Sequence, residues 1–366
     1  MPDVHAVRRS RLADHLSQEG LTAAMVTDLV NVRYLTGFTG SNAALWLAAD
    51  TTTDAGARLA TDGRYRDQSA AECPDIERVI DRALARALLD AAHLSPGSVV
   101  AVETHSLSVD AYTGVTELLT ASSVVARSID RAIEQLRTVK DETEQAALRQ
   151  ACDISVGALD ALHAGPLLGR SEREIARDLE QKMYERGAEA VGFDTIVATG
   201  PHSAIPHHQP TDRMVADGDF LKIDFGARYE GYHADCTRTV VVGAAQAWQN
   251  DIYAAVRAAQ QAGLDACVAG RDIAESDREV RRLLDEAGHL EHFTTGLGHG
   301  VGLQIHEDPF ISARHTGKLH AGTALTMEPG IYLAGRGGVR IEDTLVVTSG
   351  APEVLTAATK DLLELP

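Results

Sequence analysis

Four acidic side chains and one histidine in the C-terminal half have the types and number expected of a two-metal hydrolytic site. They are Asp224, Asp235, His299, Glu328 and Glu342. Carboxylates in one pocket resist ionising together, because each raises the pKa of the others. Two divalent ions would bring a charge of +4 against the −4 of the four carboxylates. If these side chains converge, we therefore expect a pair of divalent metal ions between them.

The first two aspartates lie in segments whose alternation predicts β-strands. Residues 220–226 place Asp224 on the polar face, and residues 235–242 begin with Asp235. The connection between them is typical of a hairpin. We expect Asp224 to lie opposite Asp235, where cross-strand Cβ atoms are about 4.5–5.5 Å apart. The alternative is a hairpin that carries two ordinary surface aspartates.

The other three candidate ligands follow further strand and turn signals. Glu328 ends an alternating segment, residues 323–328, which Pro329 and Gly330 terminate. Glu342 lies in a second alternating segment, residues 339–347, on the same face as Arg340. His299 lies in a glycine-rich segment, residues 296–303, in which backbone can approach a ligand closely. We expect two strands to present the glutamates and a turn to present the histidine.

The pattern of elements predicts two domains. We expect an α/β domain over residues 1–133 and an α+β catalytic domain over residues 134–366. The Ser171-Glu-Arg-Glu segment is a capping box that predicts a helix ending near Gly187. The other predicted elements are strands at 23–26, 43–47 and 98–102, and helices at 4–18, 76–92, 108–120, 140–165, 247–268 and 272–287.

Composition excludes several classes of partner. The formal net charge of −19 argues against nucleic acid and against an anionic membrane surface. We find neither the apolar core of a secretory signal nor a membrane-spanning run, so we expect a cytoplasmic protein. The four cysteines, Cys73, Cys152, Cys236 and Cys267, have no paired spacing, which favours reduced thiols over disulfides.

Several short motifs resemble those of the metal-dependent Xaa-Pro peptidases, the aminopeptidase P and prolidase family with the creatinase or "pita-bread" fold. They occur in the family's order in the C-terminal half, and two further matches lie in the N-terminal half. They are Ala204-Ile-Pro-His-His, Lys222-Ile-Asp-Phe-Gly, Gly231-Tyr-His-Ala-Asp-Cys-Thr-Arg-Thr, Gly298-His-Gly-Val-Gly-Leu-Gln-Ile-His-Glu, Met327-Glu-Pro-Gly-Ile-Tyr, Gly338-Val-Arg-Ile-Glu-Asp-Thr, Tyr34-Leu-Thr-Gly-Phe-Thr-Gly-Ser and Thr61-Asp-Gly-Arg-Tyr. The resemblance implies a pita-bread catalytic domain preceded by a smaller creatinase-like N-terminal domain.

The resemblance also implies a role for each site residue. Asp235 and Glu342 would bridge two metal ions, Asp224 would serve one ion, and His299 and Glu328 the other. This donor set favours Mn²⁺, with Co²⁺ or Zn²⁺ as alternatives. The nucleophile would be a metal-bound hydroxide, because a metal can lower the pKa of bound water to about 7.

Four residues are expected to assist catalysis. Glu328 would move a proton from the nucleophile to the leaving amine. His207 and His306 match family histidines that contact the substrate and the tetrahedral intermediate, whereas His208 is expected to be structural. Arg340 would orient carboxylates near Glu342, with a surface ion pair as its alternative role.

Substrate length remains open between two hydrolases. The first removes an N-terminal residue from peptides with proline at the second position. The second is restricted to Xaa-Pro dipeptides and needs a cation for the free carboxylate. Many prolidases place an arginine where this chain has Phe310, which favours the aminopeptidase. A third alternative is a non-catalytic binding protein of the same fold.

Two further expectations come from the resemblance. Relatives often carry a histidine where this chain has Thr295, so catalytic rate or substrate preference is expected to differ there. Relatives are also commonly dimeric, so we expect a homodimer.

Overall fold

The computed structural model describes residues 3–50, 56–92 and 94–366. The chain folds into two compact units, Met1–Arg137 and Thr138–Pro366. Each unit has its own hydrophobic core among the described residues. In the part of the chain that is described, no helix has both the length and the apolar character needed to cross a bilayer.

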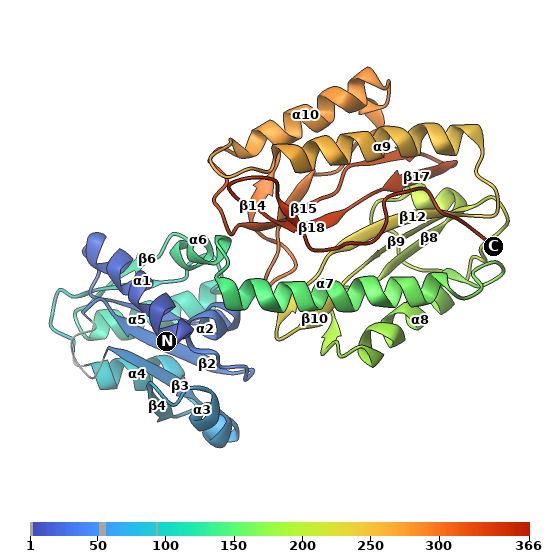
Figure 1. The fold of residues 1–366 in the computed structure, drawn as a ribbon. Helices are drawn as coiled ribbons and strands as arrows, with labels where there is room; N and C mark the ends of the chain where they lie inside the picture. The colour runs from blue at the N-terminus through green and yellow to red at the C-terminus, as the bar shows by residue number, and fades with distance from the viewer. Residues whose placement is uncertain (1–2, 51–55, 93) are drawn as a thin grey trace. The chain divides into compact units, whose positions relative to one another are not determined.

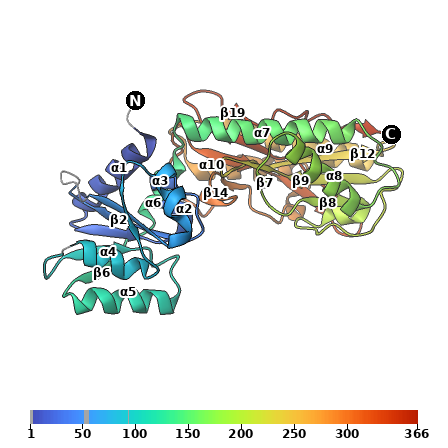
Figure 2. The same ribbon diagram turned by 90° about the horizontal axis from the view of Figure 1, so that it is seen from below.

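The first unit is a six-stranded mixed sheet covered by helices on both faces. Its strand order is β4-β3-β2-β1-β5-β6, in which β1 pairs in parallel with β5 and antiparallel with β2. Figure 2 shows α1 and α2 on one side of this sheet and α4 and α5 on the other. The elements are α1 (Val4–Gln18), β1 (Ala23–Val26), α2 (Leu29–Thr36), β2 (Ala43–Ala48), β3 (Ala57–Thr61), α3 (Arg66–Glu72), β4 (Glu77–Ile80), α4 (Leu84–Ala92), β5 (Val99–Val102), α5 (Val109–Ala121), β6 (Val125–Ser128) and α6 (Ala132–Thr138).

One predicted helix in this unit is wrong in its first half. The segment expected as a helix over 76–92 begins as strand β4, which pairs in parallel with β3. The β-branched pair Val79 and Ile80 favours a strand. The Asp81 carboxylate then accepts a hydrogen bond from the backbone N–H of Ala83, at 2.7 Å, just before α4 begins.

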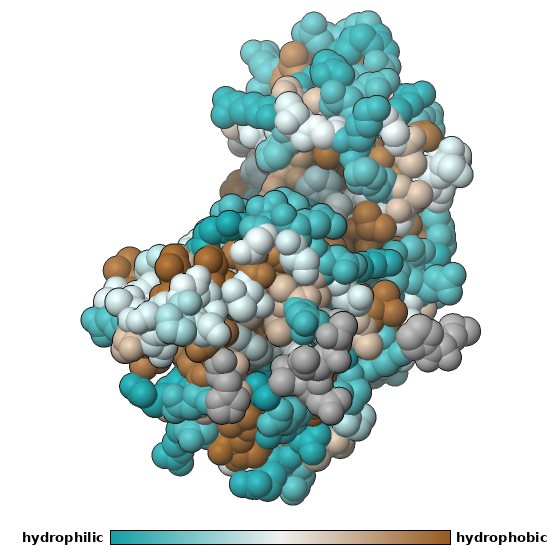
Figure 3. All heavy atoms as spheres, turned by 90° about the vertical axis from the view of Figure 1, so that its left-hand side faces the viewer, coloured by the Kyte–Doolittle hydropathy of each residue, from teal (hydrophilic) through white to brown (hydrophobic). Residues whose placement is uncertain are grey.

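On the face of the first unit that Figure 3 presents, hydrophobic residues lie at several places among hydrophilic ones. Figure 3 shows brown residues separated by hydrophilic ones rather than gathered into one continuous patch. The large exposed hydrophobic residues of the unit are Leu29, Val109, Tyr112 and Val125.

The second unit has strands between two pairs of helices. Figure 1 shows α7 and α8 on one side of the strands and α9 and α10 on the other. Its sheets have the orders β20-β12-β9-β8, β14-β13-β15-β18-β19, β11-β10-β7 and β16-β17. The elements are α7 (Glu142–His163), α8 (Glu172–Glu185), β7 (Ala190–Val191), β8 (Ile196–Thr199), β9 (Phe220–Phe225), β10 (Ala227–Tyr229), β11 (Tyr232–His233), β12 (Cys236–Val242), α9 (Ala247–Ala266), α10 (Ile273–Glu286), β13 (Gly298–Gly300), β14 (Glu307–Ile311), β15 (Ala324–Met327), β16 (Gly330–Leu333), β17 (Gly337–Arg340), β18 (Asp343–Val346), β19 (Glu353–Val354) and β20 (Glu364–Leu365).

Local sequence signals account for where α7 and α8 begin and where α8 ends. Ser171 and Glu174 form the predicted capping box of α8, and Asp141 and Glu144 form another at the start of α7. Each box satisfies backbone N–H groups that the first helical turn leaves without partners. Gly187 then adopts a φ of +98°, a conformation that glycine accepts at little cost.

Two separate cores hold the strands between the helix pairs. One packs β8, β9 and β12 against α7 and α8, and the other packs β12, β15 and β17 against α9 and α10. Side chains on the two faces of β12 therefore belong to different cores. The strands between the two helix pairs are therefore packed on both sides, and they provide a rigid backbone for the polar side chains that lie between the strand layers.

Candidate functional site

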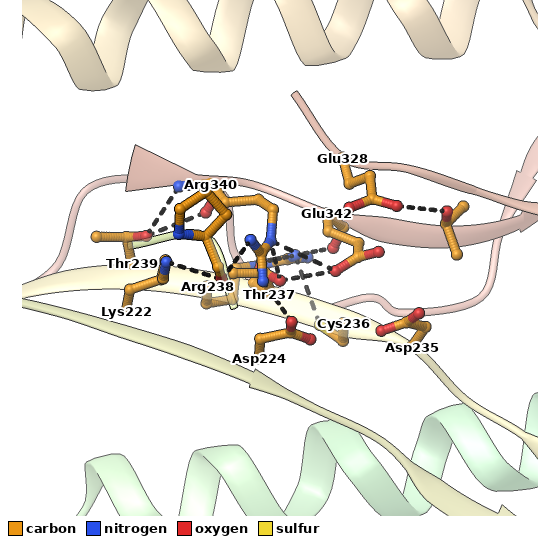
Figure 4. Close-up of polar contacts among 12 residues, drawn as sticks. Lys222, Asp224, Asp235, Cys236, Thr237, Arg238, Thr239, Glu328, Arg340 and Glu342 are labelled. Atoms are coloured by element: carbon orange, nitrogen blue, oxygen red, sulfur yellow. Dashed lines mark hydrogen bonds and ion pairs between the residues drawn. The ribbon is translucent and has the colours of Figure 1, made fainter. Parts of the chain in front are cut away.

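The predicted site residues meet in one pocket of the second unit. It is a cavity of about 530 Å³ lined by Asp224, Asp235, His299, Glu328, Glu342, His207, His306 and Arg340. Figure 4 shows its four carboxylates between two layers of strands, with Asp224 and Asp235 in one layer and Glu328 and Glu342 in the other. The sequence therefore identified the residues that converge, although they span residues 207–342.

The predicted pairing of Asp224 with Asp235 is wrong by two residues. Asp224 lies opposite Thr237 in the antiparallel pair of β9 and β12. The turn is centred between Glu230 and Gly231, whose φ angles of +48° and +81° suit a tight hairpin turn. This turn also pairs Tyr229 with Tyr232 and so fixes the register. Asp235 precedes β12 and reaches the same pocket from a diagonal position.

His299 lies in a short strand rather than in the predicted turn. Strand β13 pairs antiparallel with β14 and β15. A Cβ on Gly298 would lie 2.1 Å from the Thr326 carbonyl oxygen, and one on Gly300 would lie 2.3 Å from that of Asp308. The glycines are therefore needed because neighbouring backbone packs tightly on both sides of the histidine.

The two glutamates lie at strand ends. Glu328 follows the last residue of β15, as the sequence predicts. Glu342 lies between β17 and β18, so the single strand expected over 339–347 is interrupted at the glutamate. Its backbone N–H donates to the Thr237 carbonyl at 3.1 Å, which ties it to the layer that carries the aspartates.

The orientation of the His299 ring leaves one nitrogen available to a cation. Nδ1 lies 3.0 Å from the Gly300 carbonyl oxygen, and because a carbonyl only accepts, Nδ1 carries the hydrogen. Nε2 then points a lone pair at Asp235 Oδ2, at 3.5 Å, and at Glu328 Oε1, at 3.4 Å. A lone pair facing two carboxylates is unfavourable unless a proton or a metal ion lies between them.

Burial makes the carboxylates basic. It raises the pKa of Asp235 and of Glu342 well above the ordinary range, and neighbouring carboxylates add to both shifts. Burial also raises the pKa of Glu328 to about 7, although the nearby Arg340 charge opposes the shift. The cluster therefore favours positive charge, which protons or metal ions can supply.

The donor set fits divalent ions. Ligand atoms of Asp235, His299 and Glu342 lie within 4.8 Å of one another, close enough to share an ion. Asp224 Oδ1 is buried and, in the described part of the chain, has no hydrogen-bond partner. A buried acceptor without a partner costs free energy unless it finds a donor or a cation.

Arg340 is buried and joins the carboxylates to the loop that carries His207. Its Nη2 donates to Asp224 Oδ2, and its Nε donates to Thr237 Oγ1 at 2.9 Å. Its Nη1 donates to the Tyr332 hydroxyl at 3.0 Å and to the Pro206 carbonyl at 3.2 Å. The surface ion pair considered for Arg340 is thus wrong, because its side chain is 2% exposed.

The two histidines of the pocket differ in their surroundings. The rings of His306 and His299 are in edge-to-face contact, with centroids 4.4 Å apart. Burial lowers the pKa of His306, and the nearby His299 and His207 lower it further. His207 is exposed at the pocket wall, whereas His208 is buried and hydrogen-bonded to Glu172 at 2.8 Å. His208 is therefore structural, as expected.

Sequence reasoning missed several residues that hold the site. Thr237 donates to Glu342 Oε2 at 2.6 Å, and Thr326 donates to Glu328 Oε1 at 3.3 Å. Lys222 Nζ donates to the Ile205 carbonyl at 2.6 Å. Lys222 and Thr237 share the polar faces of their strands with the aspartates, a signal that could have identified them.

Fold and pocket together are those of a pita-bread metallopeptidase. Residues 146–349 match the model of metallopeptidase family M24, and residues 8–139 match the creatinase/prolidase N-terminal domain. The chain belongs to metallopeptidase family M24. It is therefore a hydrolase of a family whose members use divalent metal ions.

Three similar proteins illustrate the relationship. The Xaa-Pro dipeptidase of Pyrococcus furiosus is 40% identical over 65% of this chain and 68% of its own length. The structure of an Xaa-Pro dipeptidase from Bacillus anthracis is 32% identical, with a TM-score of 0.91, and covers 99% of this chain and 100% of that one. An X-Pro aminopeptidase from Thermotoga maritima is 34% identical, with a TM-score of 0.87, over 98% and 99% of the two chains.

Proposed function

We propose that the protein hydrolyses the peptide bond before proline in Xaa-Pro substrates, using two divalent metal ions. The observation that carries the proposal is the convergence of four buried carboxylates with the Nε2 lone pair of His299. The names of the similar proteins support the choice of an Xaa-Pro bond.

Five side chains would hold the ions. Asp224, Asp235, His299, Glu328 and Glu342 line the pocket and would supply the oxygen and nitrogen ligands, in the roles that the family resemblance implies. When bound, divalent ions lower the pKa of water to near neutrality and polarise a substrate carbonyl. The oxygen-rich donor set favours Mn²⁺, with Co²⁺ and Zn²⁺ as alternatives.

The protein's own side chains then move protons and stabilise charge. Glu328 takes the proton of the attacking water and delivers it to the amine that leaves, a task that suits a carboxylate at the pocket wall. His207 and His306 donate hydrogen bonds to the carbonyl oxygen as negative charge develops on it. Arg340 holds Asp224 in place and carries no proton in the reaction.

Two substrate lengths are supported by different observations. Phe310 lies near His299, with ring centroids 6.5 Å apart, and offers no cation for a free carboxylate, which favours an aminopeptidase. Arg173 and Arg177 of α8 line the same pocket and could bind the carboxylate of a dipeptide. Two of the similar proteins are named dipeptidases, and their names favour the dipeptidase at least as much as Phe310 favours the aminopeptidase.

Metal analysis combined with four substrates tests the proposal. We expect about two equivalents of metal per chain after loading with Mn²⁺ or Co²⁺, and turnover of Ala-Pro but not of Ala-Ala. Absence of both metal and turnover would overturn the enzymatic proposal.

Substrate length is decided by comparing Ala-Pro with Ala-Pro-Ala and with the amide Ala-Pro-NH₂. A dipeptidase should cleave Ala-Pro but neither Ala-Pro-Ala nor Ala-Pro-NH₂. Neither of these has a carboxylate on the proline, at the position that a guanidinium would bind. An aminopeptidase cleaves all three.

A further inference from the structure

A buried carboxylate lies beneath the loop that carries His207. Glu172, the first residue of α8, has a side chain that is 0% exposed. Its Oε1 accepts hydrogen bonds from the Thr199 N–H and from His202 Nδ1, both at 2.9 Å. Its Oε2 accepts from His208 Nε2 at 2.8 Å, and from the Thr211 N–H and hydroxyl at 2.8 and 2.7 Å.

These donors lie on both sides of His207 in the sequence. Thr199 and His202 precede it, while His208 and Thr211 follow it. The backbone of the first turn of α8 adds two contacts to the same segment. The Glu172 N–H donates to the Arg213 carbonyl at 3.1 Å, and the Arg173 N–H donates to the Thr211 carbonyl at 3.2 Å. One carboxylate and one helical turn thus hold both ends of the loop.

The centre of the loop is held from the metal side of the pocket. Lys222 Nζ donates to the Ile205 and Pro206 carbonyls at 2.6 and 3.3 Å, and Arg340 donates to the Pro206 carbonyl. His207 follows these carbonyls directly, and its own side chain is exposed to the pocket. The backbone, which Glu172 holds at both ends of the loop, therefore sets the position of the His207 Cα and Cβ and so the part of the pocket that its imidazole can reach.

A metal ion at Glu172 is the alternative, since ligand atoms of Glu172, His202 and His208 lie within 4.8 Å of one another. A carboxylate offers about four lone-pair positions, and five donors already point at this one. Burial alone would raise its pKa, but the hydrogen bonds from Thr211, His208 and Thr199 outweigh burial and lower the pKa to about 2. The cluster is therefore an anionic hydrogen-bond centre with no position left for a cation.

We propose that Glu172 is a positioning residue that fixes residues 199–213 so that His207 reaches the substrate during hydrolysis. The inference rests on the proposed function, because it gives Glu172 a role only through the His207 imidazole. Glu172 lies outside the group of candidate metal ligands and is not among the residues that line the pocket.

The principal test is Glu172→Gln, alone and combined with His207→Ala. Glutamine keeps the size of the side chain but turns an N–H₂ group toward donors, so the loop loses part of its support. We expect kcat for Ala-Pro to fall about 10- to 100-fold, as is usual for residues that orient functional histidines. In the His207→Ala background, Glu172→Gln should lower kcat by less than about threefold. The effects of two residues that act through one group are not additive.

Hydrogen exchange gives a readout that needs no turnover. Amides of residues 199–213 should exchange faster in Glu172→Gln than in the wild type, while those of β9 and β12 and the metal content stay unchanged. Glu185→Gln makes the same change at the opposite end of α8 and is the matched control, because the exposed Glu185 carboxylate accepts a hydrogen bond from Gln181 Nε2 of the same helix at 3.0 Å. It should change neither kcat nor exchange.

Thr211→Val replaces the principal test if Glu172→Gln does not fold. It removes the 2.7 Å hydroxyl contact with Glu172 and the 3.2 Å hydrogen bond that the same hydroxyl accepts from the Arg213 N–H, and it should lower kcat about three- to tenfold. A wild-type protein without turnover overturns the proposed function. If the wild type is active and Glu172→Gln keeps the wild-type kcat, only the Glu172 inference is overturned. The same holds if Glu172→Gln lowers kcat by the same factor in the His207→Ala background as it does alone.

Discussion

The proposed function gives the buried Glu328 carboxylate two tasks, metal binding and proton transfer. Its pKa of about 7 reflects burial, and its Oε1 lies 3.4 Å from His299 Nε2. We expect Glu328→Gln to lower kcat at least 1,000-fold, because glutamine can neither take a proton nor neutralise a divalent ion. The measurement is turnover of Ala-Pro after metal loading, with metal content determined in parallel. A variant that retains more than a tenth of the wild-type rate would exclude Glu328 as the proton carrier.

The same residue predicts how the metal-free protein responds to pH. The raised pKa means that folded Glu328 keeps a proton that the unfolded side chain has lost, so its contribution to stability is greatest below its ordinary pKa and is lost as pH rises through about 7. Asp235 and Glu342 shift in the same direction. The buried histidines oppose this only below about pH 6.5, their ordinary pKa.

The test is the melting temperature in EDTA between pH 6.5 and 8. It should fall with increasing pH in the wild type and fall less in Glu328→Gln. With Mn²⁺ present the decline should disappear or reverse, because metal and protons compete for the same oxygens. A wild-type melting temperature that rises across this range in EDTA would contradict the assignment of the raised pKa.

The strand and loop that carry His306 are anchored by a buried ion pair. Lys140 Nζ lies 3.0 Å from Glu307 Oε2, and the two side chains are 1% and 5% exposed. Glu307 Oε1 also accepts from the Gln304 N–H at 2.9 Å. The pair therefore joins the start of α7 to the residue next to His306.

We expect Lys140→Met to lower the free energy of unfolding by about 3 kcal/mol, because it leaves a buried carboxylate without its cation. Lys140→Met/Glu307→Gln should recover part of the loss, since the remaining amide is neutral. Arg149→Met is the control on the same helix. Arg149 pairs with Glu353 at the surface, and such pairs contribute less than about 1 kcal/mol. Urea denaturation measures all three variants, and equal losses in Lys140→Met and Arg149→Met would refute the role of burial.

At the scale of the whole molecule, all the residues that line the pocket belong to the second unit. They lie between residues 173 and 342, within Thr138–Pro366, which also holds two of the hydrophobic cores. We expect a fragment of residues 138–366 to unfold cooperatively. Mn²⁺ should raise its melting temperature, because a ligand that binds the folded state stabilises that state. Circular dichroism with and without the metal tests this. A fragment without a cooperative transition would show that the first unit is needed for folding.

The domain boundary expected after residue 133, the homodimer and the cytoplasmic location stay predictions.

Sequence alone determined most of the long helices and the residues that converge in the pocket, because both depend on short-range signals. The capping box at Ser171 needs only a hydroxyl and a carboxylate three residues apart, and the alternation in residues 220–226 places Asp224 on a polar face. The set of candidate ligands and candidate catalytic residues also followed from the motifs, because their order and spacing are typical of one family. All of them line the same pocket.

Tertiary structure alone decided how these residues meet. The register that sets Asp224 opposite Thr237 depends on where the Glu230–Gly231 turn closes, and one residue of difference in the turn centre moves every pair by two. Strand β13 forms only because neighbouring backbone packs against Gly298 and Gly300. Glu172 carries no signal in the sequence beyond its place at the start of a helix, since its five donors come from residues 27 to 39 positions away. Burial, which sets the pKa of the carboxylates, likewise exists only once the layers have packed.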